Sequence, residues 1–225
     1  MQLSVIIPTL NEADNIVGCL RSIRSQAADA EILVVDGGSS DNTVSRARPY
    51  AEVIAGPRGR ARQMNLGGRH ASGDVLLFLH ADSRVHPSAL AYLDQVMRDP
   101  AIVGATFTLW FDTNHYLLRF FASMTRFEGR IFRYGDQGII ARHAVFEALG
   151  GFIEAPLMDD VDFLWRMSAA GPTALIPLPV TTSARRFMKR GVVRQQSLNI
   201  ALVVAWLLGA QPETLARWYY GPPAQ

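Results

Sequence analysis

The first hundred residues alternate four short apolar segments with stretches of helical periodicity. The apolar segments are nearly continuous, which is typical of strands that are buried on both faces of a sheet. Strands joined by helices in this way form a parallel sheet covered on both sides. We therefore expect an α/β fold, a mostly parallel central sheet flanked by helices, with strands at residues 3–8, 31–36, 52–55 and 75–79 and helices at 11–26, 42–48, 61–70 and 87–97.

From about residue 101 the pattern is less regular. It predicts strands at 102–111 and 138–141 and helices at 117–127, 158–169, 191–208 and 212–219, and it assigns no element to residues 173–190. No repeat, low-complexity segment or long linker divides the chain. We expect one domain over residues 1–225, in which a regular half (about 1–100) binds a cofactor and an irregular half (about 101–225) binds a substrate.

Composition and charge exclude several classes of protein. Hydrophobic residues make up 49% of the chain and charged residues 19%, so extensive disorder is not expected. The net charge is only +2, and the basic residues cluster locally at 58–62 and 185–190, which indicates anion sites and no nucleic-acid partner. The single cysteine, Cys19, excludes an internal disulfide and fits a reducing compartment. Its apolar neighbours predict a buried thiol.

Neither a signal peptide nor a membrane span is predicted. The N-terminus has no basic segment, and Pro8 interrupts its apolar run. The longest apolar run, residues 200–208, is about half as long as the roughly 20 residues that a spanning helix needs. We expect a cytoplasmic protein. The run at 200–208 favours a core or dimer helix, and the alternative is a helix resting on the inner face of a membrane.

Polar residues follow three of the four strands, and such sheets bind ligands beyond the carboxyl ends of their strands. These residues are Thr9, Leu10, Asn11 and Glu12 after the first strand, Asp36 at the end of the second, and His80, Ala81 and Asp82 after the fourth. Asp36 can accept hydrogen bonds from a ribose or base, or bind the backbone of its own turn. His80 and Asp82 can hold Mg²⁺ or Mn²⁺ on phosphate oxygens, although a helix-capping aspartate explains the pattern equally well.

Two charged segments add to the expected crevice. Arg60, Arg62 and Asn65 lie at a strand-to-helix junction. Guanidinium groups and the N–H groups of a helix start can bind a diphosphate. The alternative is that this segment is simply the solvated start of a helix. Asp159 and Asp160 begin a predicted helix, so one can cap it while the other serves as a base for an acceptor hydroxyl. The motifs of P-loops, dinucleotide folds, serine hydrolases and zincins are absent.

Taken in order, these segments resemble the family 2 glycosyltransferases of the GT-A fold. Residues 4–12 resemble the opening strand and loop of that family, and residues 34–43 resemble the strand whose aspartate contacts the nucleotide base. The segment 80–82 stands in the place of the Asp-x-Asp motif, and 158–160 in the place of the Glu-Asp pair whose second acid is the base. The resemblance covers nearly the whole chain.

The resemblance implies a metal-dependent enzyme that moves one sugar from a nucleotide-diphosphate donor to an acceptor hydroxyl with inversion. Residues 9–12 and Asp36 would hold the nucleoside. Asp82 would hold Mg²⁺ or Mn²⁺ on the diphosphate, with Arg60 or Arg62 adding positive charge. Asp160 would remove the acceptor proton. The two halves then become a nucleotide-binding half and an acceptor-binding half.

Four shorter segments (59–65, 79–82, 135–138 and 183–186) resemble a compact bacterial subgroup named for its genomic association with radical-SAM and selenium-related proteins. Further candidates for acceptor or phosphate contacts are Asp136, Gln137, Asp159, Arg185 and Arg186. His80 replaces the first acid of the family's metal motif, so only Asp82 carries over as a metal ligand. The processive motif Gln-x-x-Arg-Trp is absent, which favours transfer of a single sugar.

Two other functions fit part of the pattern. A nucleotidyltransferase shares a similar sheet, but its first loop is normally rich in glycine, whereas residues 9–12 contain none. A catalytically degenerate nucleotide-sugar-binding module would explain His80. The acceptor, a peripheral membrane contact and a homodimer are all left open by the sequence.

Overall fold

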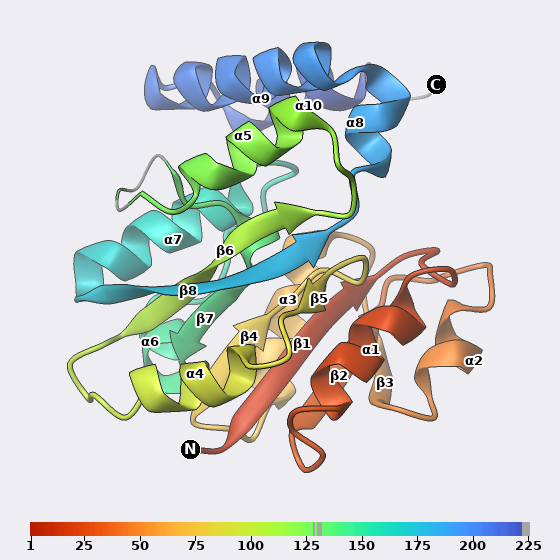
Figure 1. Cartoon of the computed structure of the whole chain (residues 1–225), viewed down its shortest axis with the longest axis vertical. Coiled ribbons are helices and arrows are strands. Elements are labelled where there is room, and N and C mark those ends of the chain that lie inside the picture. The colour runs from red at the N-terminus through yellow and green to blue at the C-terminus, as the bar shows by residue number, and fades with distance from the viewer. Residues whose placement is uncertain (128, 130–131, 222–225) are drawn as a thin grey trace.

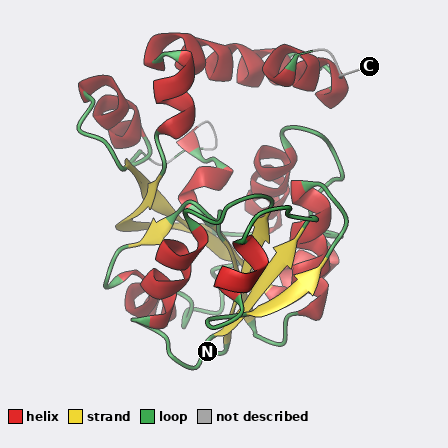
Figure 2. Ribbon diagram, turned by 90° about the vertical axis from the view of Figure 1, so that its right-hand side faces the viewer, coloured by secondary structure: helices red, strands yellow, loops and turns green. Residues whose placement is uncertain are grey.

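The computed structural model describes residues 1–127, 129 and 132–221. In this part of the chain eight strands form one sheet in the order β3-β2-β1-β4-β7-β6-β8-β5. The strands are β1 (Leu3–Thr9), β2 (Glu31–Asp36), β3 (Glu52–Ala55), β4 (Val75–Phe78), β5 (Arg84–Val85), β6 (Gly104–Phe111), β7 (Ile139–Arg142) and β8 (Thr173–Thr182). Helices cover both faces of the sheet (Figure 1, Figure 2).

The helices of the described residues are α1 (Ile16–Arg24), α2 (Thr43–Ala47), α3 (Arg60–His70), α4 (Ala89–Val96), α5 (Tyr116–Met124), α6 (His143–Ala148), α7 (Asp159–Ala170), α8 (Arg185–Arg190), α9 (Val192–Leu207) and α10 (Pro212–Tyr220). A 3-10 turn, η2, spans Gly135–Gln137. Strands β1 to β4 pair in parallel, β6 pairs with β8 in parallel, and the pairings of β7 with β4 and β6 and of β5 with β8 are antiparallel. The expected α/β fold with a mostly parallel sheet is confirmed.

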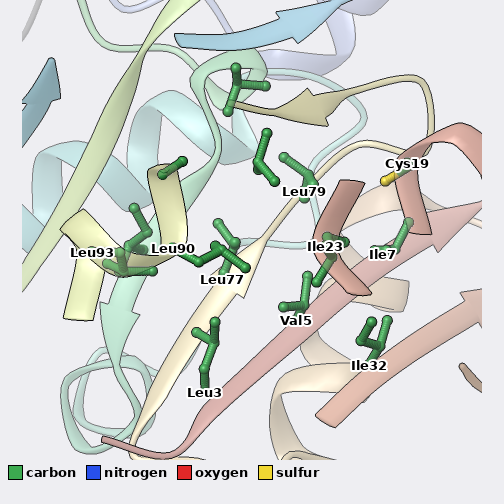
Figure 3. Close-up of a cluster of buried hydrophobic side chains, with 14 of the residues drawn as sticks. Leu3, Val5, Ile7, Cys19, Ile23, Ile32, Leu77, Leu79, Leu90 and Leu93 are labelled. Carbon is green, nitrogen blue, oxygen red and sulfur yellow. The ribbon is translucent and has the colours of Figure 1, made fainter. Parts of the chain in front are cut away.

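The side chains of β1 show why this segment occupies the middle of the sheet. Leu3, Val5 and Ile7 point to one face, where they pack with α1 and α4 (Figure 3). Ile6 belongs to the cluster on the other face, formed with α3, α6 and α7. Because both faces are covered, the strand has to be apolar at nearly every position. Cys19 lies in the first cluster and is fully buried, as expected, and this burial raises the pKa of its thiol.

The sequence pattern did not predict β8, although it is the longest strand. Pro177 and Pro179 lie inside it, and proline lacks the N–H that a strand donates to its neighbour. The register between β6 and β8 shifts between Phe107 and Thr108, and the segment with the prolines absorbs the shift. On its other side β8 pairs only with the two residues of β5. Proline is tolerated here because β8 lies close to the sheet edge.

Helices α5, α8, α9 and α10 gather at one end of the molecule, opposite the N-terminus (Figure 1). Leu118 and Ala122 of α5 pack with Phe187 of α8 and Val192 of α9. Leu202 of α9 joins a second cluster with α10 and the start of α7. No helix within the described residues is long and apolar enough to cross a membrane.

Candidate active site

A cavity of about 910 Å³ lies at the carboxyl ends of β1 and β4. Its size is typical of small-molecule sites. Its walls come from both halves of the chain: the segments after β1 and β4, the start of α3, η2, the start of α7, and helices α8 to α10. The candidate residues that line it are Thr9, Leu10, Glu12, Arg60, Arg62, His80, Ala81, Asp82, Asp136, Asp159, Asp160, Arg185 and Arg186.

Asp36 and Asn11 do not line this cavity. The Asp36 carboxylate is buried and accepts hydrogen bonds from the N–H groups of Gly38 and Ser39, at 3.0 and 2.8 Å, and from the Ser39 hydroxyl. Asn11 adopts a positive φ of 55°, and its side-chain oxygen accepts a hydrogen bond of 2.9 Å from the N–H of Ser40. Both side chains fix the turn after β2. Asp36 still adjoins the cavity through Thr9, whose hydroxyl lies 3.3 Å from its carboxylate.

Asn65 and Gln137 are also placed outside the cavity lining. Asn65 is buried in α3 and forms two hydrogen bonds of 2.8 Å, to the N–H and the carbonyl of Phe152. Gln137 is fully buried; it accepts a hydrogen bond from the N–H of Tyr134 and donates one to the carbonyl of Phe107. These two amides hold loops in place around the site.

The segment after β4 directs two ionisable side chains into the cavity. Asp82 lies 3.4 Å from the guanidinium of Arg185, and Nδ1 of His80 lies 3.3 Å from the carboxylate of Asp136. Burial raises the pKa of Asp82, and the nearby charges of His80 and Arg185 only partly oppose this effect. Burial alone would lower the pKa of His80, but the hydrogen bond to Asp136 and the negative charge of that carboxylate together outweigh it, so this pKa is raised.

The chemistry of these side chains fits a divalent cation that is shared with a ligand. A carboxylate oxygen and an imidazole nitrogen are both ligands for Mn²⁺, and carboxylates suit Mg²⁺. Within the described residues, however, no three His, Cys, Asp or Glu side chains form a group that could hold a metal. A cation at Asp82 would therefore take its remaining ligands from phosphates and water, which is the usual coordination of Mg²⁺.

The start of α7 places two adjacent carboxylates differently. Asp159 is buried and forms a two-pronged ion pair with Arg60, one prong of which is 3.1 Å long. Asp160 faces the cavity, 3.2 Å from Arg60, and accepts a hydrogen bond of 2.8 Å from the N–H of Gly135. Glycine at position 135 leaves room for this carboxylate, because a Cβ there would lie 2.6 Å from an Asp160 carboxylate oxygen. Asp160 is thus held from two sides while it borders the cavity.

Three arginines that line the cavity, Arg60, Arg62 and Arg185, are engaged in ion pairs. Arg62 pairs with Glu154 at 2.9 Å on the surface, and Arg60 is bound to α7 as described. Arg185 pairs with Glu12 as well as approaching Asp82, so the guanidinium nearest the expected metal ligand comes from α8. Arg186 donates a hydrogen bond to the hydroxyl of Tyr219 and lies 5.3 Å from the centre of its ring.

Several residues that line the cavity were not among the candidate site residues predicted from the sequence. Arg58, Tyr134, Gln195, Asn199 and Tyr219 all line the cavity. Arg58 lies in the basic cluster at 58–62, and that cluster was the available signal. The other four carry no local motif, because only the packing of η2, α9 and α10 brings them to this site.

The sheet and its cavity define a class of α/β proteins that bind a ligand beyond the carboxyl ends of parallel strands. Residues 4–147 match the model of a known family, "Glycosyl transferase family 2". The chain belongs to this family. The match covers β1 to β7 and the segment 80–82 but ends before α7.

Relatives of known sequence align with part of the chain. The glycosyltransferase AglE of Haloferax volcanii is 38% identical over 37% of this chain and 31% of its own length. A PGL/p-HBAD biosynthesis glycosyltransferase of Mycobacterium bovis is 36% identical over 42% of this chain and 47% of its own length. The matches thus span less than half of each relative.

Solved structures align with a larger share of the chain than these relatives do. The mannosyltransferase PcManGT from Pyrobaculum calidifontis, in complex with GDP-Man and Mn²⁺, has a TM-score of 0.70 at 22% identity and covers 98% of this chain and 68% of that one. TarS 1-349 of S. aureus with UDP has a TM-score of 0.68 at 18% identity, covering 81% and 60%. These similarities confirm the GT-A fold. The narrower resemblance to a radical-SAM and selenium-associated subgroup stays a prediction.

Proposed function

We propose that the chain is an inverting glycosyltransferase that moves one sugar from a nucleotide-diphosphate donor to an acceptor hydroxyl. One observation carries the proposal: a single cavity brings together Asp82, beside the cationic Arg185, and Asp160, held by Arg60 and Gly135. The first pair suits a metal-bound diphosphate. The second suits a positioned base.

The donor would occupy the part of the cavity near β1 and β4. The loop at residues 9–12, with the turn held by Asp36, would contact the nucleoside. Asp82 would hold Mg²⁺ or Mn²⁺, which when bound would stabilise the charge that develops on the departing diphosphate. The neighbours solved with GDP-Man and Mn²⁺ and with UDP support this choice of donor and metal.

The acceptor hydroxyl would approach Asp160. As the new bond forms between the acceptor oxygen and the anomeric carbon, the bond from that carbon to the diphosphate oxygen breaks, and the hydroxyl proton passes to the Asp160 carboxylate. One displacement from the opposite face inverts the anomeric configuration. Arg60 and the Gly135 N–H keep the carboxylate aimed at the cavity.

The remaining candidates take supporting roles in this proposal. Arg185, 3.4 Å from Asp82, would add positive charge beside the diphosphate, the role that the sequence predicted for Arg60 or Arg62. Asp159 holds Arg60, and Asp136 holds His80. Arg186 lines the cavity next to Tyr219 and is placed to meet the acceptor. Gln137 supports the loop that carries Gly135.

The test is a calorimetric and thermal-shift screen of nucleoside diphosphates and nucleotide sugars, with and without Mn²⁺. A ligand that binds the native state must raise its stability. We expect a metal-dependent shift with one nucleotide and its loss in Asp82→Ala. Slow hydrolysis of the selected donor, followed by NMR, should release the inverted anomer first. No shift with any nucleotide in folded protein would support a degenerate module, and release of pyrophosphate from a nucleoside triphosphate and a sugar phosphate would support a nucleotidyltransferase.

A further inference from the structure

The exposed apolar side chains of this protein are concentrated on one group of helices. Eleven of the fourteen large hydrophobic side chains that are exposed in the described part of the chain lie at residues 116–127 or 188–220. Those segments form or adjoin α5, α8, α9 and α10, which gather at the end of the molecule farthest from the N-terminus (Figure 1, Figure 2). We call the outward surface of these four helices the apolar-basic face.

Helix α9 shows the pattern most clearly. Its exposed positions Val193, Ile200 and Val204, with Leu207 and Leu208 at its end, follow one another at intervals that keep them on one side of a helix. The opposite side carries Val192, Gln195 and Leu202, which are buried against the rest of the protein. The helix is therefore apolar on both sides, and only the inner side is covered.

The charge of this region differs from that of the remaining chain. Residues 112–127 and 185–221 contain eight Arg and Lys and two Asp and Glu, a net charge of +6. The other residues contain fourteen basic and eighteen acidic side chains, a net charge of −4. Six of the eight basic residues, including Arg119, Lys189, Arg194 and Arg217, are exposed and do not line the cavity. The exposed hydrophobic side chains of this region thus lie in segments that carry a net positive charge.

We propose that the apolar-basic face rests on an anionic lipid bilayer and that the acceptor is a lipid-linked hydroxyl compound presented from that bilayer. Exposed aliphatic and aromatic side chains bordered by Arg and Lys are the features of a helix that lies in a membrane interface. Helix α9, with 16 residues, is about 24 Å long and would lie along the surface. A second copy is a poorer occupant, because a symmetric dimer would bring two surfaces with an excess of Arg and Lys against each other.

The cavity adjoins the surface that we propose to rest on the membrane. Ile200 and Tyr220 belong to the apolar-basic face and also line the cavity that contains Asp160. The cavity therefore opens at the edge of this face. An acceptor whose lipid part stays in the bilayer could place its hydroxyl in the cavity without leaving the membrane. This assignment of the acceptor rests on the proposed glycosyl transfer; the docking surface itself does not.

Vesicle flotation with the full chain tests the docking surface. We expect binding to phosphatidylcholine vesicles that contain phosphatidylglycerol, weaker binding at high salt, and none to phosphatidylcholine alone. The double variant Lys189→Glu/Arg194→Glu should partition about 30-fold more weakly or worse, since each basic residue near the surface contributes a factor of about five. The matched control is Arg48→Glu/Arg69→Glu, which makes the same change of net charge directly after α2 and in α3, away from this face. Equal losses in both would overturn the proposal.

A second set of variants tests the exposed hydrophobic side chains of the apolar-basic face. Val204→Gln/Leu208→Gln should weaken vesicle binding by about tenfold or more, whereas Tyr92→Gln, an exposed aromatic on α4, should have no effect. Light scattering on the same proteins measures self-association. A dimer that Val204→Gln/Leu208→Gln converts to a monomer would overturn the membrane proposal in favour of a second copy.

The acceptor class is tested last, with donor binding as the internal control. Labelled sugar should pass from the donor to an organic-soluble product when polar lipid extract is supplied as vesicles. Labelling of water-soluble hydroxyl compounds alone would overturn the lipid acceptor. Absence of vesicle binding in protein that still binds nucleotide with Mn²⁺ would overturn this inference and leave the proposed function intact, whereas absence of nucleotide binding would remove the proposed function.

Discussion

Strands β2 and β4 both pair with β1, and an aspartate lies at or beyond the carboxyl end of each, but the two carboxylates are bound differently. Asp36, the last residue of β2, is held by N–H and hydroxyl groups of residues two and three positions further on. Asp82, after β4, lies in the cavity beside Arg185, which is more than one hundred residues away in the sequence. A carboxylate held by its own turn fixes the backbone. A carboxylate that pairs with a guanidinium group from a distant helix, as Asp82 does, can exchange this partner for a ligand.

The carboxylates of Glu31 and Asp160 differ in the same way. Glu31, at the start of β2, accepts hydrogen bonds from the N–H and hydroxyl of Ser72 and from the hydroxyl of Ser4, on the side of the sheet away from the cavity. Asp160 lies in the cavity between Arg60 and Gly135. We therefore expect substitutions of Asp82 and Asp160 to change ligand binding and turnover, and substitutions of Asp36 and Glu31 to change stability.

The largest effect is expected for Asp160→Asn. Asparagine keeps the size of the side chain but cannot accept the acceptor proton, so turnover should fall by about 10²–10⁴-fold while donor affinity changes little. Turnover is measured with the donor selected by the binding screen. Asp162→Asn is the control, because Asp162 lies in the same helical turn but pairs with Arg166 outside the cavity. Equal turnover in Asp160→Asn and the wild type would rule out Asp160 as the base.

Asp82→Asn should have the next largest effect. Loss of the charged ligand should weaken Mn²⁺-dependent nucleotide binding by about 10–100-fold or more, the range known for changes around metal ligands. The melting temperature without ligand should stay close to that of the wild type. Calorimetric titration in the presence and absence of Mn²⁺ measures the first quantity. Metal-independent weakening would contradict the assignment of Asp82 as the metal ligand.

Asp36→Asn should mainly reduce stability. The variant weakens charged hydrogen bonds in a buried turn, which costs about 1–3 kcal/mol of unfolding free energy. Urea unfolding measures this loss, and nucleotide titration below the transition measures binding. We expect the loss of affinity to be smaller than for Asp82→Asn. A stable variant with strongly reduced affinity would reverse the comparison and identify Asp36 as the principal nucleoside contact.

Glu31→Gln should have the smallest effect: a loss of folding stability that is present near neutral pH and shrinks at acidic pH. Partial burial opposes ionisation of Glu31, but hydrogen bonds from Ser4 and Ser72 outweigh it and hold its pKa below the usual value of 4.5. A lowered pKa in the folded state contributes stability above about pH 4.5, and this contribution is lost as the pH falls through the folded-state pKa. The wild type should therefore exceed the variant in stability at pH 6, and the difference should shrink towards pH 3. A constant difference would contradict the role assigned to Glu31.

The regular first half was predicted closely because its signals are local. Strand β2 was predicted with its observed bounds, 31–36, and α3 within one residue. Nearly continuous apolar residues and strand-to-helix turns are determined within a few positions of the chain. Helix α1 was predicted to begin at residue 11 but begins at Ile16, because residues 11–15 form a turn in which the Glu12 carbonyl accepts two backbone hydrogen bonds.

The second half was predicted less well, and β8 is the clearest case. Its prolines argue against a strand, and its place near the edge of the sheet, which permits them, is a property of the fold as a whole. Helix α8 was not predicted either, although its basic residues were noted. Its charged start reaches the cavity only because β8 carries the chain back to it.

The sequence by itself determined the central sheet, the edge at which a ligand site forms, and most of the charged residues there, since buried strands and the residues that follow them leave local patterns. The tertiary structure alone decided which of those side chains face the cavity. Asp82 and Asp160 do, whereas Asp36, Asn65 and Gln137 bind the surrounding backbone. Orientation depends on partners that lie far apart in the chain, and no local pattern records it.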